Sequence, residues 1–302
     1  MSERTDVAVP VEVRDRARTL LPAAIDLAKR AGIELRSRHP GRASDTAAVP
    51  DQRTRALDVQ YKGARDLVTA ADLASEEIIL AGLAEVDGET PILSEEQASA
   101  EGARSARQDS SGYLWIVDPL DGTTNFAHGH PLYSVSIALT WNLEPVAAVI
   151  LAPESGNTWS ASIGEGTRRN AVPCRVSPES ELLNALLATG FSYGREELET
   201  GGLELFGDLL RSAREIRRGG SACLDLAFVS NGVFAGFWEA DLKPHDVAAG
   251  ALLIREAGGI VTDFSGEDDW LHGRSIVAGN PDIHRLLRRA IDQRGLGARK
   301  NA

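Results

Sequence analysis

Two aspartates in the string WIVDPLDGTTNF, residues 115–126, are the side chains best placed to do chemistry in this sequence. Asp118 and Asp121 follow an apolar run and flank a Pro-Leu pair, and Pro119 restricts the backbone on both sides of it. Two carboxylates held this close on a stiff turn ionise together at low cost only when a cation lies between them. A hard divalent ion such as Mg²⁺ prefers oxygen ligands of this kind. The string therefore predicts a metal site.

The residues that follow can hold further polar groups near this turn. Gly122 permits a positive φ or a close backbone approach, and Thr123 and Thr124 present hydroxyls and amides directly after it. The Asp-Pro and Asp-Gly dipeptides alone are typical of an ordinary surface turn. The complete string, placed after an apolar strand, favours the functional interpretation.

Three further acidic sites lie at a distance in the sequence: Asp66 and Asp72 in ARDLVTAAD, Glu95 and Glu96 in ILSEE, and Asp246 in LKPHDVAAG. Each has an ordinary interpretation when taken alone. Asp72 is typical of a charge in the first turn of a helix, Glu96 of a solvated neighbour, and Asp246 of a helix N-cap. An N-cap at Asp246 is compatible with metal binding, because helix N-termini also favour anions such as phosphate.

Two helices are predicted before the acidic strings. Residues 13–38 form an amphipathic pattern in which apolar residues recur at helical spacing: Leu21, Ile25, Ala28, Gly32 and Leu35. Pro22 conflicts with this pattern, so the regular helix is expected to begin there or to be kinked. Residues 39–60 are rich in Pro, Ser, Thr, Asp and Arg and predict an exposed loop. A second helix is predicted after Thr69, with apolar positions at Ile78, Ile79, Leu80 and Leu83.

Short β-rich runs come next: TPILSEE, YLWIVDPLDG, YSVSIALTW and PVAAVILAP. The pattern then becomes mixed, with LLNALLATG, a segment after Ser221, GVFAGFWEA, a helix at 246–257, GGIVTDF and SIVAGN. The expected fold class is α+β followed by α/β, with a boundary near 165–175. We predict an α+β subdomain at residues 1–170 that carries the metal site, and an α/β subdomain at 171–302 that completes the active site.

Composition excludes several classes of protein. The chain has 302 residues, 43% of them hydrophobic and 25% charged, as expected of a globular protein. The net charge of −12 argues against a nucleic-acid binder, and no basic or aromatic stripe favours a two-metal nuclease. Cys174 and Cys223 have no metal-binding or redox spacing and are expected to be buried free thiols. No signal peptide or membrane-spanning run is present, which predicts a cytoplasmic protein.

The acidic strings together resemble the inositol monophosphatase family. ARDLVTAAD, ILSEE, WIVDPLDGTTNF and KPHDVAAGALLIREAGG occur in the family's order and spacing, from about residue 13 to residue 290. The stretches GEGTRRNAVPCRVS, RRGGSACLDLAFVSNG and FWEADLKPHD are also similar to it. The resemblance implies a layered αβαβα sandwich, shared with fructose 1,6-bisphosphatase.

The resemblance also implies a ligand set for Mg²⁺. Glu95, Asp118 and the main-chain carbonyl of Leu120 would hold a first ion, and Asp118, Asp121 and Asp246 a second. A third, weaker ion would lie near Glu95 and be bound mostly through water. Such clamps stabilise the attacking and leaving oxygens and lower the pKa of a bound water. Mn²⁺ would fit the same oxygen ligands.

For catalysis, the resemblance pairs Asp66 with Thr123, so that a carboxylate orients a hydroxyl toward the nucleophilic water. Glu95 is the third expected catalytic residue. Phosphate oxygens would be bound by Gly122, Thr123 and Thr124. The rest of the substrate would be bound by Gly220, Ser221, Ala222, Glu239 and Asp246. Glu239 is equally typical of a strand-end charge, and Ser221 of a helix cap.

The expected activity is the hydrolysis of myo-inositol 1-phosphate to inositol and phosphate. Histidinol phosphate, fructose 1,6-bisphosphate and 3′-phosphoadenosine nucleotides are alternative substrates for the same scaffold. A regulatory binding partner of RNA-processing machinery is an alternative of another class. The resemblance also implies lithium inhibition and a homodimer. His245 departs from the family, which usually has Trp there, and we interpret it as a packing substitution that bears on substrate preference.

Overall fold

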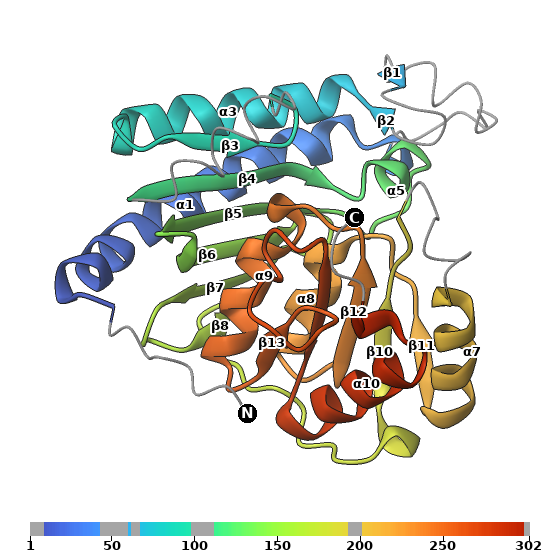
Figure 1. The fold of residues 1–302 in the computed structure, drawn as a ribbon. Helices are drawn as coiled ribbons and strands as arrows, with labels where there is room; N and C mark the ends of the chain where they lie inside the picture. Colours follow the sequence, from blue (N-terminus) through green and yellow to red (C-terminus); the bar gives the residue numbers. More distant parts are fainter. Residues whose placement is uncertain (1–8, 43–59, 62–66, 98–111, 193–200, 299–302) are drawn as a thin grey trace.

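Two packed helices form the outermost layer of the fold in the computed structural model, which describes residues 9–42, 60–61, 67–97, 112–192 and 201–298 (Figure 1). Helix α1 spans Val11–Arg38 and helix α3 spans Ala70–Asp87. Their buried apolar residues, among them Leu27, Leu35 and Ile79, pack on one face of a large sheet.

Helix α1 continues through Pro22 and starts earlier than predicted. Pro22 removes the amide that would bond to the carbonyl of Arg18. Both residues are exposed, so water can satisfy that carbonyl and the helix continues.

The second layer is a seven-stranded sheet, in the strand order β3-β4-β5-β6-β7-β8-β9. Strands β3 and β4 are parallel and the other pairs are antiparallel. The strands are β3 (Ile92–Ser94), β4 (Tyr113–Asp121), β5 (Ser134–Trp141), β6 (Glu144–Ala152), β7 (Asn157–Ser162), β8 (Thr167–Arg169) and β9 (Val172–Pro173).

Both faces of this sheet are buried. Along β4, Trp115 and Val117 face α1 and α3, whereas Ile116 faces the opposite side, as the two-residue period of a strand requires. The opposite side packs on helices α8 (Ala222–Ser230) and α9 (Pro244–Glu256), which form the third layer. Helix α9 corresponds to the helix predicted at 246–257. It begins two residues earlier than predicted, at Pro244, because proline suits the first turn of a helix.

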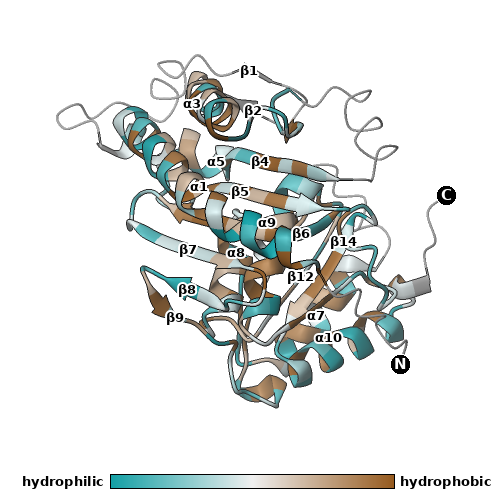
Figure 2. Ribbon diagram, turned by 90° about the vertical axis from the view of Figure 1, so that its left-hand side faces the viewer, coloured by the Kyte–Doolittle hydropathy of each residue, from teal (hydrophilic) through white to brown (hydrophobic). Residues whose placement is uncertain are grey.

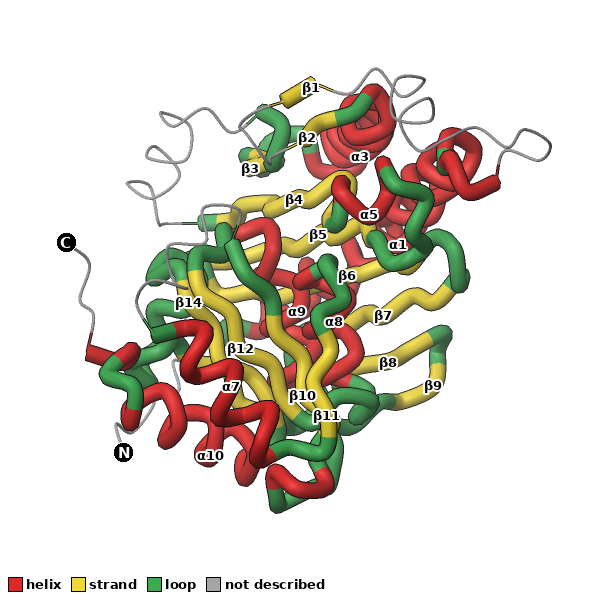
Figure 3. Tube along the Cα trace, turned by 90° about the vertical axis from the view of Figure 1, so that its right-hand side faces the viewer, coloured by secondary structure: helices red, strands yellow, loops and turns green. Residues whose placement is uncertain are grey.

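A five-stranded sheet forms the fourth layer, in the order β11-β10-β12-β14-β13. Helices α7 (Gly202–Ser212) and α10 (Pro281–Gln293) cover its outer face (Figure 3). Teal and brown residues alternate on α10 in Figure 2, as expected of an amphipathic outer helix. The strands are β10 (Leu186–Thr189), β11 (Glu215–Arg217), β12 (Gly236–Ala240), β13 (Ile260–Thr262) and β14 (Ser275–Gly279).

The layers follow one another as helices, sheet, helices, sheet, helices, which confirms the predicted αβαβα sandwich. The change from one sheet to the other falls after β9, beside the predicted boundary at 170–171. One core cluster contains residues of both sheets, so the division into two subdomains stays a prediction.

Short elements complete the described part of the chain. They are η1 (Pro40–Arg42), β1 (Gln60–Tyr61), β2 (Leu67–Val68), α5 (Thr123–Ala127), η2 (Leu182–Asn184) and η3 (Leu296–Ala298). Most of the predicted 39–60 loop lies outside the described residues. His39, at its start, is buried against Phe126 and Tyr133 rather than exposed.

Candidate active site

A β-bulge brings Asp118 and Asp121 to the same place. Residues three apart on a regular strand point to opposite faces of the sheet. In the pairing of β4 with β5, however, Asp118 lies opposite Ser136 and Asp121 opposite Ser134, so β4 contains one extra residue. Both carboxylates are buried, and they lie within 4.8 Å of each other in one cluster.

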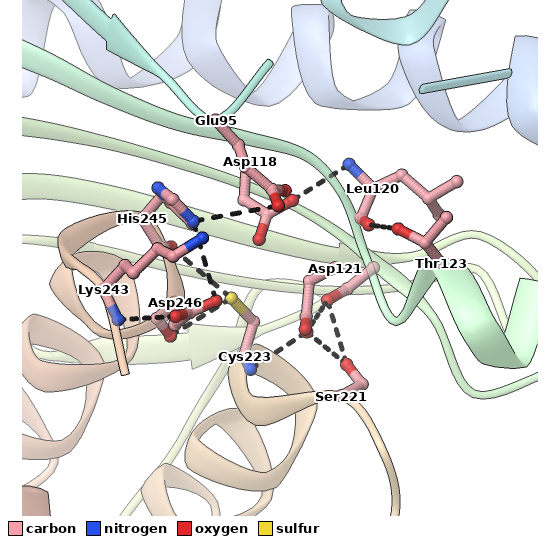
Figure 4. A network of polar contacts seen from close by, with 11 residues as sticks. Glu95, Asp118, Leu120, Asp121, Thr123, Ser221, Cys223, Lys243, His245 and Asp246 are labelled. Atoms are coloured by element: carbon pink, nitrogen blue, oxygen red, sulfur yellow. Dashed lines mark hydrogen bonds and ion pairs between the residues drawn. The ribbon is translucent and has the colours of Figure 1, made fainter. Parts of the chain in front are cut away.

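Glu95 joins these aspartates because β3 runs parallel to β4. Ser94 pairs with Val117, and the amide of Glu95 then donates to the carbonyl of Val117 at 3.2 Å. The residue after β3 is thereby placed beside Asp118 (Figure 4). The two carboxylates are close enough for the charge of Glu95 to raise the pKa of Asp118.

Asp246 comes from the first turn of α9, on the other side of the cluster. The expectation that it caps this helix was wrong: the N-cap is Lys243, because the helix starts at Pro244. The carboxylate of Asp246 instead accepts the amide of Lys243 at 2.7 Å, which fixes it at the helix N-terminus.

The electrostatics of this cluster favour a bound cation. Burial, followed by the charges of Glu95, Asp121 and Asp246, holds the pKa of Asp118 well above its usual range. Burial raises the pKa of Asp121 to about 6 although Ser221 hydrogen-bonds to it. Buried carboxylates that repel one another are stabilised by a cation among them. Their oxygen-only donors, together with the nearby carbonyl of Leu120, fit a hard divalent cation.

A buried pair formed by Thr123 and Asp72 lies beside the bulge. The hydroxyl of Thr123 lies 3.0 Å from Oδ1 of Asp72 and 3.1 Å from the carbonyl oxygen of Leu120. Oδ2 of Asp72 accepts the amide and the hydroxyl of Thr69, so the carboxylate also belongs to the capping box of α3. Burial raises the pKa of Asp72 to about 6.

This pair adds a residue to the sequence assignment. Asp66, the predicted partner of Thr123, lies outside the described residues, so its role stays a prediction; within the described part of the chain, Asp72 is a carboxylate that contacts Thr123. The interpretation of Asp72 as a helix-start charge was correct but incomplete, because sequence gave no sign of the contact with Thr123 across the layers.

The residues at the start of α8 form hydrogen bonds with Asp121, one of the clustered carboxylates. Ser221 is the N-cap of α8 and accepts the amide of Leu224, which confirms its predicted alternative role. Its hydroxyl also bonds to Asp121, whose Oδ2 accepts the amide of Cys223 at 3.0 Å. Gly122, at φ +92°, packs against this segment: a β-carbon there would lie 3.2 Å from the carbonyl oxygen of Gly220.

A pocket of about 250 Å³ opens over the cluster. Of the residues predicted for the site, these line it: Glu95, Asp121, Gly122, Gly220, Ser221, Ala222, Glu239 and Asp246. Asp118, Leu120, Thr123 and Thr124 do not line it. Thr123 is buried next to the bulge, where its hydroxyl lies close to the carbonyl oxygen of Leu120 and to the carboxylate of Asp72.

Glu239, on β12, also lines the pocket. Its carboxylate packs on Gly190, where a β-carbon would overlap it, so only glycine leaves room for this side chain. Burial and the charge of Asp246 hold the pKa of Glu239 well above its usual range, while Arg218 opposes that shift. Glu239 is therefore buried in the pocket and is not a solvated strand-end charge.

Several pocket residues were not predicted from sequence. Asp225, Arg218, Lys243 and Arg274 add charge to the wall of the pocket. Nothing in their local sequence distinguishes them from surface charges, since only the packing of α8 and of the start of α9 against the end of β11 and the start of β14 brings them together.

The side chains of Cys223 and His245 also lie beside the clustered carboxylates. The thiol of Cys223 donates to the carbonyl oxygen of Asp246 at 3.3 Å, and burial holds its pKa well above its usual range. Both cysteines are free, as predicted, although Cys174 is only half-buried. The imidazole of His245 is buried and faces Glu95 and Asp246, and its interpretation as a packing substitution stays a prediction.

The geometry can be compared with known proteins. The family model described as "Inositol monophosphatase family" matches residues 16–296. The chain is 43% identical, over 76% of its length and 85% of the relative, to a protein named "Putative Nus factor SuhB" of Neisseria meningitidis serogroup B. It is 42% identical to an "Inositol-1-monophosphatase" of Mesorhizobium japonicum, over 78% of this chain and 86% of the relative.

A solved structure shows the same fold. The "extragenic suppressor protein suhB" of Bartonella henselae superposes with a TM-score of 0.80 at 35% identity, covering 91% of this chain and 99% of that one. Among the described residues, no helix is both long and apolar enough to cross a membrane. The family match extends over both sheets and all four carboxylates of the cluster, and the chain belongs to the inositol monophosphatase family.

Proposed function

We propose that this protein hydrolyses the phosphate monoester of a small polyol, with myo-inositol 1-phosphate as the substrate. The observation that carries the proposal is the cluster of four carboxylates, Glu95, Asp118, Asp121 and Asp246, beside a pocket of about 250 Å³. Family membership supports a phosphatase, and the name of the Mesorhizobium relative supports the choice of substrate.

Two Mg²⁺ ions would be held at this cluster, with Mn²⁺ as an alternative. Glu95, Asp118 and the Leu120 carbonyl would hold one ion, and Asp118, Asp121 and Asp246 the other; a third, weaker ion would lie near Glu95. Bound there, the ions would supply Lewis acidity, which neutralises phosphate charge and acidifies a water. The protein's own contribution is to hold the carboxylates in place through the β4 bulge and the start of α9.

Thr123 and Asp72 would together remove a proton from the attacking water. The Thr123 hydroxyl donates to Asp72, so its lone pairs are available to accept a hydrogen bond from a water. Asp72 would take up the proton through that hydroxyl. Its pKa of about 6 is nearer to neutrality than that of an ordinary aspartate, which suits a general base.

The substrate would lie between the cluster and Glu239. Amides and hydroxyls at Gly122, Thr123 and Thr124 would bind phosphate oxygens, and Gly220, Ser221 and Ala222 would line the other side. Glu239, buried on Gly190, would accept hydrogen bonds from ring hydroxyls.

The test is phosphate release from a panel with and without Mg²⁺, namely inositol 1-phosphate, histidinol phosphate, fructose 1,6-bisphosphate and 3′-phosphoadenosine 5′-phosphate. Glu95→Gln should abolish turnover, whereas Glu89→Gln, an exposed glutamate just before β3, should not change it. Preference for inositol 1-phosphate is expected. Preference for another member would correct the substrate, and metal-independent turnover or none at all would overturn the hydrolase assignment.

A second candidate function is regulation of RNA-processing machinery, because a relative 43% identical to this chain is named a putative Nus factor. The net charge of −12 disfavours direct RNA contact, so the partner would be a protein. A partner captured equally well by wild type and by Glu95→Gln would support this role, because it would not depend on metal. We also propose inhibition by lithium, a homodimer and a cytoplasmic location. These three proposals rest on the family resemblance alone.

A further inference from the structure

An imidazole nitrogen of His245 faces the clustered carboxylates. It is the second residue of α9, it is only 5% exposed, and it precedes Asp246. Its Nε2 lies 4.0 Å from Oε1 of Glu95 and 3.9 Å from Oδ1 of Asp246 (Figure 4). The first turn of α9 therefore points two different donors, a nitrogen and a carboxylate, at the same space.

The spacing of these atoms suits a single ion. One donor atom from each of Glu95, Asp118 and His245 lies within 4.8 Å of the others. Two ligands of one ion are separated by at most twice the bond length of about 2.1 Å. A contraction of a few tenths of an ångström in side-chain positions would bring all three within bonding distance of one cation.

The sulfur of Cys223 offers no such ligand without rearrangement. It too lies near Asp118 and Asp121, but its thiol donates to the carbonyl oxygens of Asp246 and His245. Both bonds orient the S–H toward the backbone of α9. Among the described residues at this cluster, the imidazole is therefore the nitrogen or sulfur donor that faces the carboxylates.

We propose that His245 is a direct nitrogen ligand of the cation held by Glu95 and Asp118. This inference rests on the proposed metal-dependent function and refines its metal preference. An imidazole ligand favours Zn²⁺ over Mg²⁺, which prefers oxygen donors throughout. The site of that ion should then bind Zn²⁺ more tightly than an all-oxygen site would, while the second proposed ion, held by Asp118, Asp121 and Asp246, keeps the oxygen ligands that suit Mg²⁺.

The decisive measurement is pulsed electron paramagnetic resonance on the full-length protein loaded with Mn²⁺. A bound imidazole gives a strong nitrogen coupling to the electron spin, and labelling only the histidines with ¹⁵N changes its isotope pattern. We expect that coupling in wild type and its loss in His245→Gln, with His130→Gln, an exposed histidine outside the cluster, unchanged. Circular dichroism checks that each variant is folded.

Calorimetric titration adds an independent readout. His245→Gln should weaken Zn²⁺ binding by about tenfold or more, while Mg²⁺ binding changes much less. Mn²⁺ that binds wild type with no histidine coupling, or coupling that persists in His245→Gln, would overturn this inference and leave the proposed phosphatase intact. No divalent ion binding at all would overturn both.

Discussion

At the scale of single residues, the site combines buried carboxylates that differ in their surroundings. Asp72 is held by Thr69 and Thr123, whereas Asp121 is held by Ser134, Ser221 and an amide. Burial raises the pKa of both to about 6. The proposed roles differ because only Asp121 lies in the cation cluster, so Asp72 remains available for a proton.

Asp72 gives a prediction about pH. Asp72→Asn should lower kcat by about 10²- to 10⁴-fold, as expected for loss of a general base. In wild type kcat should rise with pH through about 6, because the base must be deprotonated, and this limb should vanish in the variant. Steady-state kinetics against pH tests both. Asp26→Asn, on the exposed side of α1, is the matched control, and an unchanged acid limb in Asp72→Asn would contradict the assignment.

Gly190 gives a second residue-scale prediction. Gly190→Ala places a methyl group where the Glu239 carboxylate now lies and should displace it. We expect KM for inositol 1-phosphate to rise about tenfold or more, from the loss of a hydrogen-bonded hydroxyl contact worth about 1.5 kcal/mol. Turnover of p-nitrophenyl phosphate, which has no ring hydroxyls, should change little. Equal losses on both substrates would show that Glu239 does not bind the alcohol.

At the scale of elements, the start of α3 joins stability to catalysis. Thr69 caps the helix through its hydroxyl and also bonds to the Asp72 carboxylate. The same hydrogen bonds that satisfy the helix terminus therefore orient the proposed base, and loss of the cap hydroxyl would remove one of the three donors to that carboxylate.

Thr69→Ala should destabilise the protein by about 1 kcal/mol, the usual effect of losing an N-cap side chain. For a chain of this size that corresponds to a fall of about 2 °C in Tm. Activity should fall with it, because Asp72 loses one of its donors. Thr69→Ser keeps the hydroxyl and should restore both values. Thermal unfolding and kcat measured together check this, and a loss of stability with unchanged activity would separate the two roles.

At the scale of the whole molecule, carboxylates from different layers of the fold meet at the site and repel one another. Asp118 and Asp121 come from the first sheet, and Asp246 comes from the helices between the sheets. Asp225 and Glu239 carry raised pKa values as well, so every resolved carboxyl shift in the pocket has the same direction. A cation at this place would join the two halves of the chain.

Metal-free protein should therefore be more stable in mild acid. A carboxyl whose pKa is raised in the folded state binds more protons there than when unfolded, so the free energy of unfolding falls as pH rises between the two values. For Asp121 these are 3.8 and about 6, a difference equivalent to about 3 kcal/mol at most. In EDTA, Tm should be higher at about pH 5 than at about pH 7.5. Added Mg²⁺ or Mn²⁺ should raise Tm mainly at the higher pH, and equal gains at both would contradict this.

Much of the fold could be predicted because its signals are local. The run YLWIVDPLDG became β4 and the helix after Thr69 became α3. Helices α7 and α10 were missed, although Asn280 and Pro281 are a clear start signal for α10. The beginnings and ends of helices were the weakest part, as the start of α9 shows.

The residues of the site, too, could be predicted only where their signals are local. Motifs located Glu95, Asp118, Asp121 and Asp246, because their neighbours are distinctive. The choice between the two aspartates of ARDLVTAAD, by contrast, depends on how α3 packs beside the bulge, and no local pattern encodes that packing. The same holds for His245, whose importance depends on the distance between α9 and β3.

The extra residue of the β4 bulge has a further consequence for the net charge of the site. A regular strand reading Asp-X-Asp would also point two carboxylates to one face, but each carbonyl between them would be committed to the sheet. The bulge leaves Leu120 without a register partner in β5, and its carbonyl oxygen lies 3.1 Å from the Thr123 hydroxyl, on the segment that joins Asp118 to Asp121. The insertion therefore offers the proposed site a neutral oxygen. A cation bound as proposed would gain a ligand there while the repulsion among the acidic groups stays the same.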